Sequence, residues 1–201
     1  MTEGFGSICA IILAAGESKR FGSENKLLVE LDGVSILERV VRCILGTGIE
    51  PTVVITGEDH ERMASLLSAS GLECIHNPDW RTGMGSSLAE GAQWIGEQTF
   101  SGILVCLGDL PYLDPGTVRQ VLERFRANAA EKIVMPTCNG RRGHPVVFPY
   151  SFLQRLMDLK GDEGAKSLIQ SAESNIEFVA VSSEGIFRDV DVPGDLGSGE
   201  G

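Results

Sequence analysis

The segment LAAGESKRFGSENK, residues 13–26, combines glycines with cations directly after an apolar run. Gly16 and Gly22 allow backbone N–H groups to come close to an anion, and Arg20 and Lys26 supply positive charge for a triphosphate. The spacing fits neither GxGxxG nor GxxxxGKS/T, the templates of the common nucleotide-binding loops. From these residues alone, a plain surface loop and a cradle for a phosphate chain both stay open.

Acidic residues end two other apolar segments. Asp109, in LGDLP, follows the apolar run that begins at Gly102, and an acid just past a buried strand often holds Mg²⁺ over a phosphate. Asp189 and Asp191, in DVDV, alternate and therefore point to the same face of an extended segment. A turn or helix cap at Asp109 and an exposed edge strand at DVDV are the alternatives.

Polar groups also gather in GMGSSL, residues 83–88, and in GRRGHP, residues 140–145. We expect the first to be a loop of backbone donors and hydroxyls before a helix. In the second, His144 is a candidate turn residue, base or substrate contact. No Ser/His/Asp or Cys/His arrangement is identifiable, so the acids and cations favour phosphoryl or nucleotidyl transfer, in which the substrate brings its own nucleophile. We expect structural roles for His60, His76, Trp80 and Trp94.

Strands and helices alternate along the chain. Apolar runs predict strands at residues 8–14, 52–56, 72–76, 102–109, 132–136, 176–181 and 186–192, with a short extended piece at 26–31. Helical spacing and caps predict helices at 35–48, 59–71, about 87–97, 114–128, 151–159 and 165–172. This order predicts an α/β fold with a mainly parallel sheet, in which ligands bind beyond the carboxyl ends of the strands.

Composition limits the classes of partner. The net charge of −11 argues against a nucleic acid, and no apolar run approaches the ~18–20 residues that would cross a membrane. The cysteines are far apart and form no CxxC pair, and no cationic stretch precedes the first apolar run. We therefore expect no signal peptide and a reducing, cytoplasmic location. We expect a single domain over residues 1–196 and a disordered tail at 197–201.

The motifs together resemble a known family. LAAGESKRFGSENK is similar to the LAAGxSxRxGxxK signature of MobA-like nucleotidyltransferases, and looks closest to the molybdenum cofactor cytidylyltransferase branch. GMGSSL, GDLP, GRRGHPVVF, GDEGAK and DVDVPGDL follow in family order, so the resemblance covers roughly residues 8–196. It implies a three-layer Rossmann-like nucleotidyltransferase fold with a mainly parallel, mixed central sheet.

The resemblance also implies a reaction and a site. CTP and molybdopterin would give molybdopterin cytosine dinucleotide and pyrophosphate, with Mg²⁺ as cofactor. The residues implied to bind the nucleotide are Leu13, Ala14, Ala15, Gly16, Arg20, Lys26, Ser86, Ser87 and Asp109. Of these, Arg20, Lys26 and Asp109 would be catalytic, and Asp109 would bind Mg²⁺ together with Asp191. The residues implied to face the phosphorylated pterin acceptor are Gly143, His144, Asp162 and Lys166.

Some positions bear on substrate choice. The guanylyl branch usually has LAGG, and the extra methyl group of Ala15 favours a pyrimidine base. The family's GDxGAR arginine is Lys166 here, and its DxDTPED ending has Val192 and Gly194 in place of Thr and Glu. The alternatives are guanylyl transfer to molybdopterin, transfer to a sugar or polyol phosphate, and a non-catalytic nucleotide- or cofactor-binding chaperone. A molybdenum hydroxylase is the candidate client protein.

Overall fold

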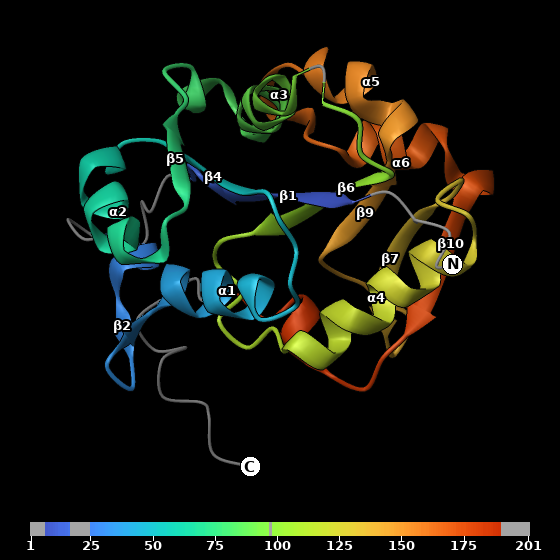
Figure 1. Cartoon of the computed structure of the whole chain (residues 1–201), viewed down its shortest axis with the longest axis horizontal. Helices are drawn as coiled ribbons and strands as arrows, with labels where there is room; N and C mark the ends of the chain where they lie inside the picture. The colour runs from blue at the N-terminus through green and yellow to red at the C-terminus, as the bar shows by residue number, and fades with distance from the viewer. Residues whose placement is uncertain (1–6, 17–24, 97, 190–201) are drawn as a thin grey trace.

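A mixed sheet forms the middle layer of the molecule (Figure 1). The computed structural model describes residues 7–16, 25–96 and 98–189. The strands run in the order β10-β7-β9-β6-β1-β4-β5, with β8 paired to β7. Their bounds are β1 Ile8–Ala14, β4 Thr52–Thr56, β5 Glu73–His76, β6 Gly102–Leu107, β7 Ile133–Cys138, β8 Arg141–Arg142, β9 Val146–Pro149 and β10 Ile176–Ala180. Neighbours pair in parallel except at β9, which is antiparallel to β6 and β7, and at β8, which is antiparallel to β7.

Helices cover both faces of this sheet. In Figure 1, α3 and α5 lie on one side and α1 and α4 on the other. The helices are α1 Ile36–Leu45, α2 His60–Leu67, α3 Met84–Ile95, α4 Pro115–Ala127, α5 Leu153–Met157 and α6 Lys166–Ser171. Short 3₁₀ turns are η2 Lys26–Leu28, η3 Ser68–Ser70, η4 Trp80–Thr82, η5 Tyr150–Phe152, η6 Gly161–Glu163, η7 Glu173–Asn175 and η8 Glu184–Ile186, and β2 Glu30–Leu31 pairs with β3 Val34–Ser35. The predicted three-layer α/β class with a mainly parallel, mixed sheet is confirmed.

The central strand β1 explains why the apolar run at residues 8–14 has no polar alternation. All its residues are buried, because helices cover the sheet on both faces. Cys9, Ile11 and Leu13 pack toward α3 and α5, whereas Ala10 and Ile12 pack toward α1 and α4. The strand therefore contributes to two hydrophobic cores and ends at its carboxyl end in the glycine-rich segment.

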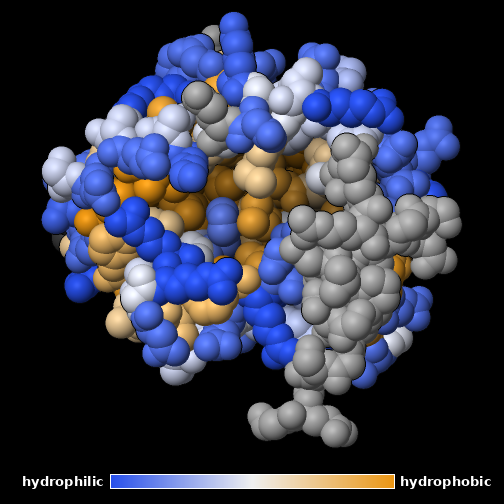
Figure 2. All heavy atoms as spheres, turned by 180° about the vertical axis from the view of Figure 1, so that it is seen from behind, coloured by the Kyte–Doolittle hydropathy of each residue, from blue (hydrophilic) through white to orange (hydrophobic). Residues whose placement is uncertain are grey.

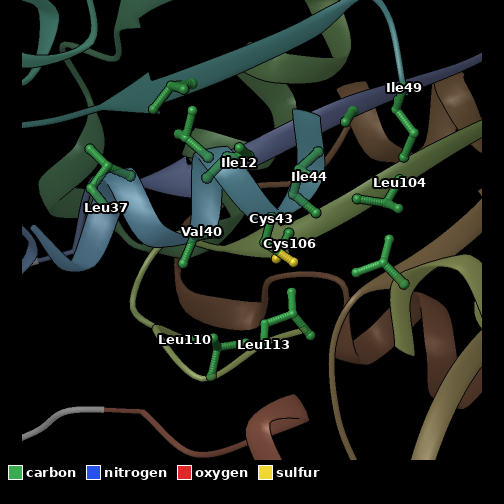
Figure 3. Packing of buried hydrophobic residues seen from close by; sticks show 14 of the residues in the cluster. Ile12, Leu37, Val40, Cys43, Ile44, Ile49, Leu104, Cys106, Leu110 and Leu113 are labelled. Atoms are coloured by element: carbon green, nitrogen blue, oxygen red, sulfur yellow. The ribbon is translucent and has the colours of Figure 1, made fainter. Parts of the chain in front are cut away.

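Four of the five cysteines are buried in the core, and Cys74 is partly buried. All of them are free, and burial raises the pKa of Cys9 and of Cys43 to about 12. Figure 3 shows the sulfurs of Cys43 and Cys106 side by side between α1 and β6, among Val40, Ile44 and Leu104. Such thiols stay protonated near neutral pH and pack as small apolar groups, as the sequence predicts.

One predicted element boundary near the site, the start of α3, is wrong. The helix expected to begin at about Ser87 begins at Met84, so GMGSSL is an N-cap and first turn rather than a loop before the helix. Gly83, the N-cap, has φ 128°, and a Cβ there would lie 2.5 Å from the carbonyl carbon of Gly161. A Cβ on Gly85 would lie 2.8 Å from the oxygen of Gly161. These glycines meet a segment far away in the sequence, which no local pattern reveals.

The extended pieces at residues 26–31 and 186–192 are also only partly correct. Lys26–Leu28 is a 3₁₀ turn because the Asn25 side chain accepts a hydrogen bond from the N–H of Leu27, and only Glu30–Leu31 is extended. Ile186 ends η8, and no strand forms over residues 187–189; residues 190–192 and the expected tail at 197–201 lie outside the described part. Within the described ranges, no helix combines the length and apolar character needed to cross a membrane.

Candidate functional site

A pocket of about 440 Å³ opens at the carboxyl ends of β1 and β6. This is the edge where a parallel sheet binds ligands. Figure 2 shows a hollow of this kind on one face of the molecule, with an apolar floor and a hydrophilic rim. The lining residues come from β1 and its exit, η2, η4, the start of α3, the end of β6 and η6: Leu13, Ala15, Gly16, Lys26, Leu27, Trp80, Arg81, Gly83, Met84, Ser87, Leu107, Asp109 and Asp162. We call it the first pocket.

An ion pair joins two predicted catalytic residues in the first pocket. The Lys26 Nζ donates to Asp109 Oδ2 at 2.6 Å, and the two side chains are only 15% and 21% exposed. Asp109 reaches this place because the Gly108 N–H donates to the Leu13 carbonyl at 2.8 Å and continues the pairing of β6 with β1. A larger residue at 108 would crowd that contact, since a Cβ there would lie 3.0 Å from the Leu13 oxygen.

Asn25 fixes the backbone from which Lys26 projects. Its side chain is 8% exposed, accepts from the Leu27 N–H, and donates to Asp59 Oδ2 at 3.0 Å. The hydrogen bonds join the start of η2 to the loop before α2. Sequence reasoning missed Asn25, although an asparagine directly before a short turn is a typical capping signal.

The carboxylate of Asp109 fits a cation. Its second oxygen, Oδ1, is closed to solvent and has no hydrogen-bond partner among the described residues. A buried carboxylate oxygen without a donor is unusual in a folded protein and suits a divalent ion that prefers oxygen ligands. No cluster of three or more candidate metal ligands occurs in the described part of the chain, and Asp191, the expected second ligand, lies outside that part, as does Arg20.

Neither close contacts nor backbone conformation in the described part of the chain require a glycine at position 16. A Cβ at this position would meet nothing within 4 Å, and its φ lies outside the left-handed region. Gly57 differs, because a Cβ there would lie 2.9 Å from the Trp80 ring. Trp80 is therefore packed and buried as expected, but its ring also lines the first pocket. The open space at Gly16 suits the close approach of a ligand.

The two serines of GMGSSL have different surroundings. The Asn77 amide donates to Ser87 Oγ at 3.0 Å and to Ser86 Oγ at 2.9 Å. Ser87 is buried and lines the first pocket. Ser86 is not among the lining residues, and its hydroxyl lies within hydrogen-bond distance of the backbone carbonyls of Asp79 and Gly83. Asn77, which sequence reasoning missed, is 2% exposed and ties the end of β5 to α3.

Arg81 is a further cation that sequence reasoning missed. Its guanidinium lies 4.4 Å from the centre of the Trp80 ring and 3.3 Å from Glu58 Oε1. The sequence signal that could have identified Arg81 is its place in a glycine-containing loop after a predicted strand.

His60 and His76 have close neighbours within the protein. His60 Nδ1 lies 2.7 Å from Thr56 Oγ1, and the two imidazole rings are 5.4 Å apart, which agrees with structural roles.

A second pocket of about 420 Å³ adjoins the first. The two share Leu13, Met84 and Asp162 in their linings. The second pocket has apolar walls from β6, β7, β9 and α3, and polar groups from β8, the β8–β9 turn, η6 and α6: Arg142, His144, Asp162, Lys166 and Gln170. Asp162 comes to the boundary because η6 packs against Gly83 and Gly85. The structure thus places three of the four predicted acceptor residues, His144, Asp162 and Lys166, around one cavity.

Gly143 is not a lining residue of that cavity. It is buried, its N–H donates to the Pro136 carbonyl at 3.0 Å, and a Cβ would lie 2.5 Å from the Ile186 oxygen. The close approach of η8 therefore leaves no room for a side chain at residue 143.

We expect Gly143→Ala to lower the free energy of unfolding by about 1–3 kcal/mol, because the added methyl group overlaps backbone atoms. Urea denaturation measures this, with Gly16→Ala as the matched control, which should change stability by less than about 0.5 kcal/mol. Equal stability of the two variants would show that η8 does not press on residue 143.

Burial lowers the pKa of His144, which lies next to the Val105 carbonyl at 3.5 Å, so the imidazole is neutral near pH 7. Because a carbonyl only accepts, this contact places the ring proton on Nδ1 and leaves Nε2 as the acceptor.

The lowered pKa makes stability depend on pH. The unfolded chain binds a proton near pH 6.5, whereas the folded chain does so only at lower pH. The stabilisation is therefore present above pH 6.5 and decreases as the pH falls toward the folded-state pKa. Urea unfolding at pH 7.5 and pH 5.5 should show a smaller loss of stability in His144→Gln than in the wild type; parallel losses would contradict this.

The comparisons with known proteins agree with this geometry. A family model described as "MobA-like NTP transferase domain" matches residues 10–176. Nicotine blue oxidoreductase of Paenarthrobacter nicotinovorans is 27% identical over 189 residues, and the purine catabolism protein PucB of Bacillus subtilis is 25% identical over 199 residues. Each alignment covers 92% of both chains.

Solved structures share the fold. Rv0371c from Mycobacterium tuberculosis has a TM-score of 0.83 at 24% identity over 96% of each chain, and another structure of that protein is a complex with manganese, with a TM-score of 0.78 at 23% identity over 94% and 95% of the chains. A CMP:2-keto-3-deoxy-manno-octonic acid synthetase complexed with CTP has a TM-score of 0.73 at 18% identity, over 94% and 95% of the chains. At these identities the likeness shows a shared fold.

Proposed function

Because the chain belongs to the family of MobA-like NTP transferases, we propose that it transfers the cytidylyl group of CTP to molybdopterin, giving molybdopterin cytosine dinucleotide and pyrophosphate. The observation that carries this proposal is the Lys26–Asp109 pair at the carboxyl ends of β1 and β6, in a pocket that adjoins a second one. Adjoining pockets suit a reaction that joins two bound molecules.

The nucleotide would occupy the first pocket. Lys26 would bind its phosphates, with Arg20 as a further phosphate ligand, and Gly16 leaves room for the chain of phosphates to approach. Leu13 and Ala15 would line the nucleotide's path, whereas Ala14, which is buried in the core and absent from the pocket lining, would support them from behind. Ser87 would contact the ribose or base, and Ser86 would support Ser87. A buried Ala15, with its methyl group in the lining, supports the smaller pyrimidine base.

The acceptor would occupy the second pocket. Its walls, from residues such as Val105, Met135 and Phe148, suit a flat ring, and Arg142 and Lys166 add positive charge for a phosphate. The acceptor's phosphate oxygen would attack the α-phosphorus in line, and Lys26 would stabilise the charge that builds up on the phosphates. Asp162 and the neutral His144 would orient the acceptor, with Gly143 supporting the His144 backbone.

Asp109, with its unpartnered Oδ1, is the proposed ligand of Mg²⁺, together with Asp191. When bound, the ion would supply Lewis-acid stabilisation of the α-phosphate and of leaving pyrophosphate. A similar protein crystallised with manganese supports a divalent ion here.

We further propose that a molybdenum hydroxylase is the client protein that receives the product. The free cysteines agree with a reducing, cytoplasmic location.

A panel of nucleoside triphosphates against candidate acceptors, with pyrophosphate detection, tests this function. We expect release from CTP that depends on molybdopterin. Release that depends on GTP would indicate another base, and release with a sugar or polyol phosphate would indicate another acceptor. Tight nucleotide binding without release would indicate a chaperone.

The relative named nicotine blue oxidoreductase suggests a redox reaction as a second candidate. In separate wells that contain NADH or NADPH and an oxidised dye as electron acceptor, oxidation of the nicotinamide with reduction of the dye would favour it.

A further inference from the structure

The contact between Lys26 and Asp109 occupies the carboxylate that the metal needs. Oδ2 accepts the lysine ammonium at 2.6 Å, and Oδ1 is closed to solvent. A divalent ion coordinates carboxylate oxygens directly, at 2.0–2.6 Å for Mg²⁺ or Ca²⁺. While this ion pair is intact, therefore, one oxygen is occupied by the ammonium and the other is closed to the solvent from which an ion would arrive.

The two cations also compete electrostatically. An ammonium group at hydrogen-bond distance from a carboxylate repels any second cation that approaches the same oxygens. Both side chains are largely shielded from solvent, so water screens this repulsion weakly. For the ion to bind, the ammonium has to leave.

The surrounding structure lets the side chain move while the backbone stays. Asn25, held by Leu27 and Asp59, fixes the start of η2, but the flexible four-carbon stem of Lys26 can turn toward another anion in the same pocket. A triphosphate would be such an anion, because it offers several charged oxygens at the open side near Gly16.

We propose that Lys26 closes the metal site of the nucleotide-free protein, and that a bound triphosphate opens it by drawing the ammonium away from Asp109. Lys26 is thus a positioning residue for the metal as well as a phosphate ligand, and the ion enters with the nucleotide rather than before it. The inference rests on the proposed function for the presence of the triphosphate, but the closing of Asp109 is testable without any substrate.

The test measures Mn²⁺ binding to the nucleotide-free protein, with the electron paramagnetic resonance signal of free Mn²⁺ as the readout. Lys26→Met should bind Mn²⁺ about tenfold more tightly than the wild type, a typical size for such coupling between sites. Adding Asp109→Asn to Lys26→Met should abolish the gain, because the oxygen that was released is then missing. Unchanged affinity in Lys26→Met would overturn the proposal.

Arg81→Met is the matched control, because it removes a positive charge from the same pocket without touching Asp109. We expect its Mn²⁺ affinity to stay within about twofold of the wild type, since the partly screened Arg81 charge acts only from a distance. An equal gain in Arg81→Met would overturn the proposal, because the loss of any positive charge from the pocket would then explain the tighter Mn²⁺ binding.

The wild type gives an answer even if Lys26→Met fails to fold, which circular dichroism would detect. Saturable Mn²⁺ binding tighter than about 100 µM without nucleotide would contradict a closed site, and weaker binding supports it. If the protein transfers no nucleotidyl group at all, these affinities still report on Asp109, so failure of this inference and failure of the proposed function are distinguishable.

Discussion

Replacing Lys26 by methionine is expected to lower the turnover of nucleotidyl transfer about 100- to 1,000-fold, the usual effect of removing a preorganised group that stabilises charge in the transition state. Lys26 is the described lysine of the first pocket, and its ammonium already lies 2.6 Å from Asp109. Methionine keeps the length and the apolar stem but removes the charge. The measurement is the initial rate of pyrophosphate release with CTP and molybdopterin.

Lys132→Met is the control for Lys26→Met. Lys132 is exposed before β7 and lines neither pocket, so the rate should stay within about twofold of the wild type. A wild-type rate in Lys26→Met would remove Lys26 from the catalytic machinery.

Replacing Asp109 by asparagine is expected to lower turnover by a similar or larger factor, about 1,000-fold, because an amide is a poor ligand for Mg²⁺ and cannot neutralise it. The change keeps the shape of the side chain, so β6 and its pairing with β1 should persist. Lys26 loses its carboxylate partner in a partly buried place, which should cost about 1–3 kcal/mol of stability. Activity assays and urea unfolding separate the two effects.

The dependence on metal distinguishes catalysis from folding in Asp109→Asn. If Asp109 holds the ion, raising Mg²⁺ should not restore the rate, whereas the exposed Asp158→Asn should behave like the wild type at every Mg²⁺ concentration. Full recovery of Asp109→Asn at high Mg²⁺ would mean that the ion is held mainly by other residues.

The sequence predicts most of the fold because local signals carry it. The unbroken apolar run of β1 requires cover on both faces, and Ser35 caps α1 with the capping box that its glutamate three residues later supplies. Asp114 and Pro115 start α4 as expected. Each of these signals lies within a few residues of the element that it specifies.

Misplaced boundaries arise from contacts between distant segments. The start of α3 lies where Gly83 and Gly85 contact η6. The turn at η8 lies where Gly185 contacts the Tyr112 backbone so closely that a Cβ on Gly185 would be 2.1 Å from the Tyr112 carbonyl oxygen. The alternating pattern of IFRDVDV suits a strand, but η8 instead provides the Ile186 carbonyl that accepts from the His144 N–H. Packing against another part of the chain overrides the local preference.

The candidate site shows the same division. Motif positions predict that Lys26 and Asp109 lie near each other, because each follows a strand of a parallel sheet. Their direct pairing, the closed Oδ1, and the supporting amides of Asn25 and Asn77 depend on side-chain geometry that spacing does not contain. Gly143 is an informative case, since its place in GRRGHP implies substrate contact while its surroundings indicate packing.

The most direct test of the proposed reaction follows the phosphorus atoms of CTP. With CTP labelled at the α-phosphorus, the label should appear in a molybdopterin-linked product, one per pyrophosphate released; with CTP labelled at the γ-phosphorus, it should appear only in pyrophosphate. The Lys26→Met protein should show both transfers slowed together. Label from the γ-position in the acceptor, or no label transfer from any nucleoside triphosphate, would contradict nucleotidyl transfer at the Lys26–Asp109 site.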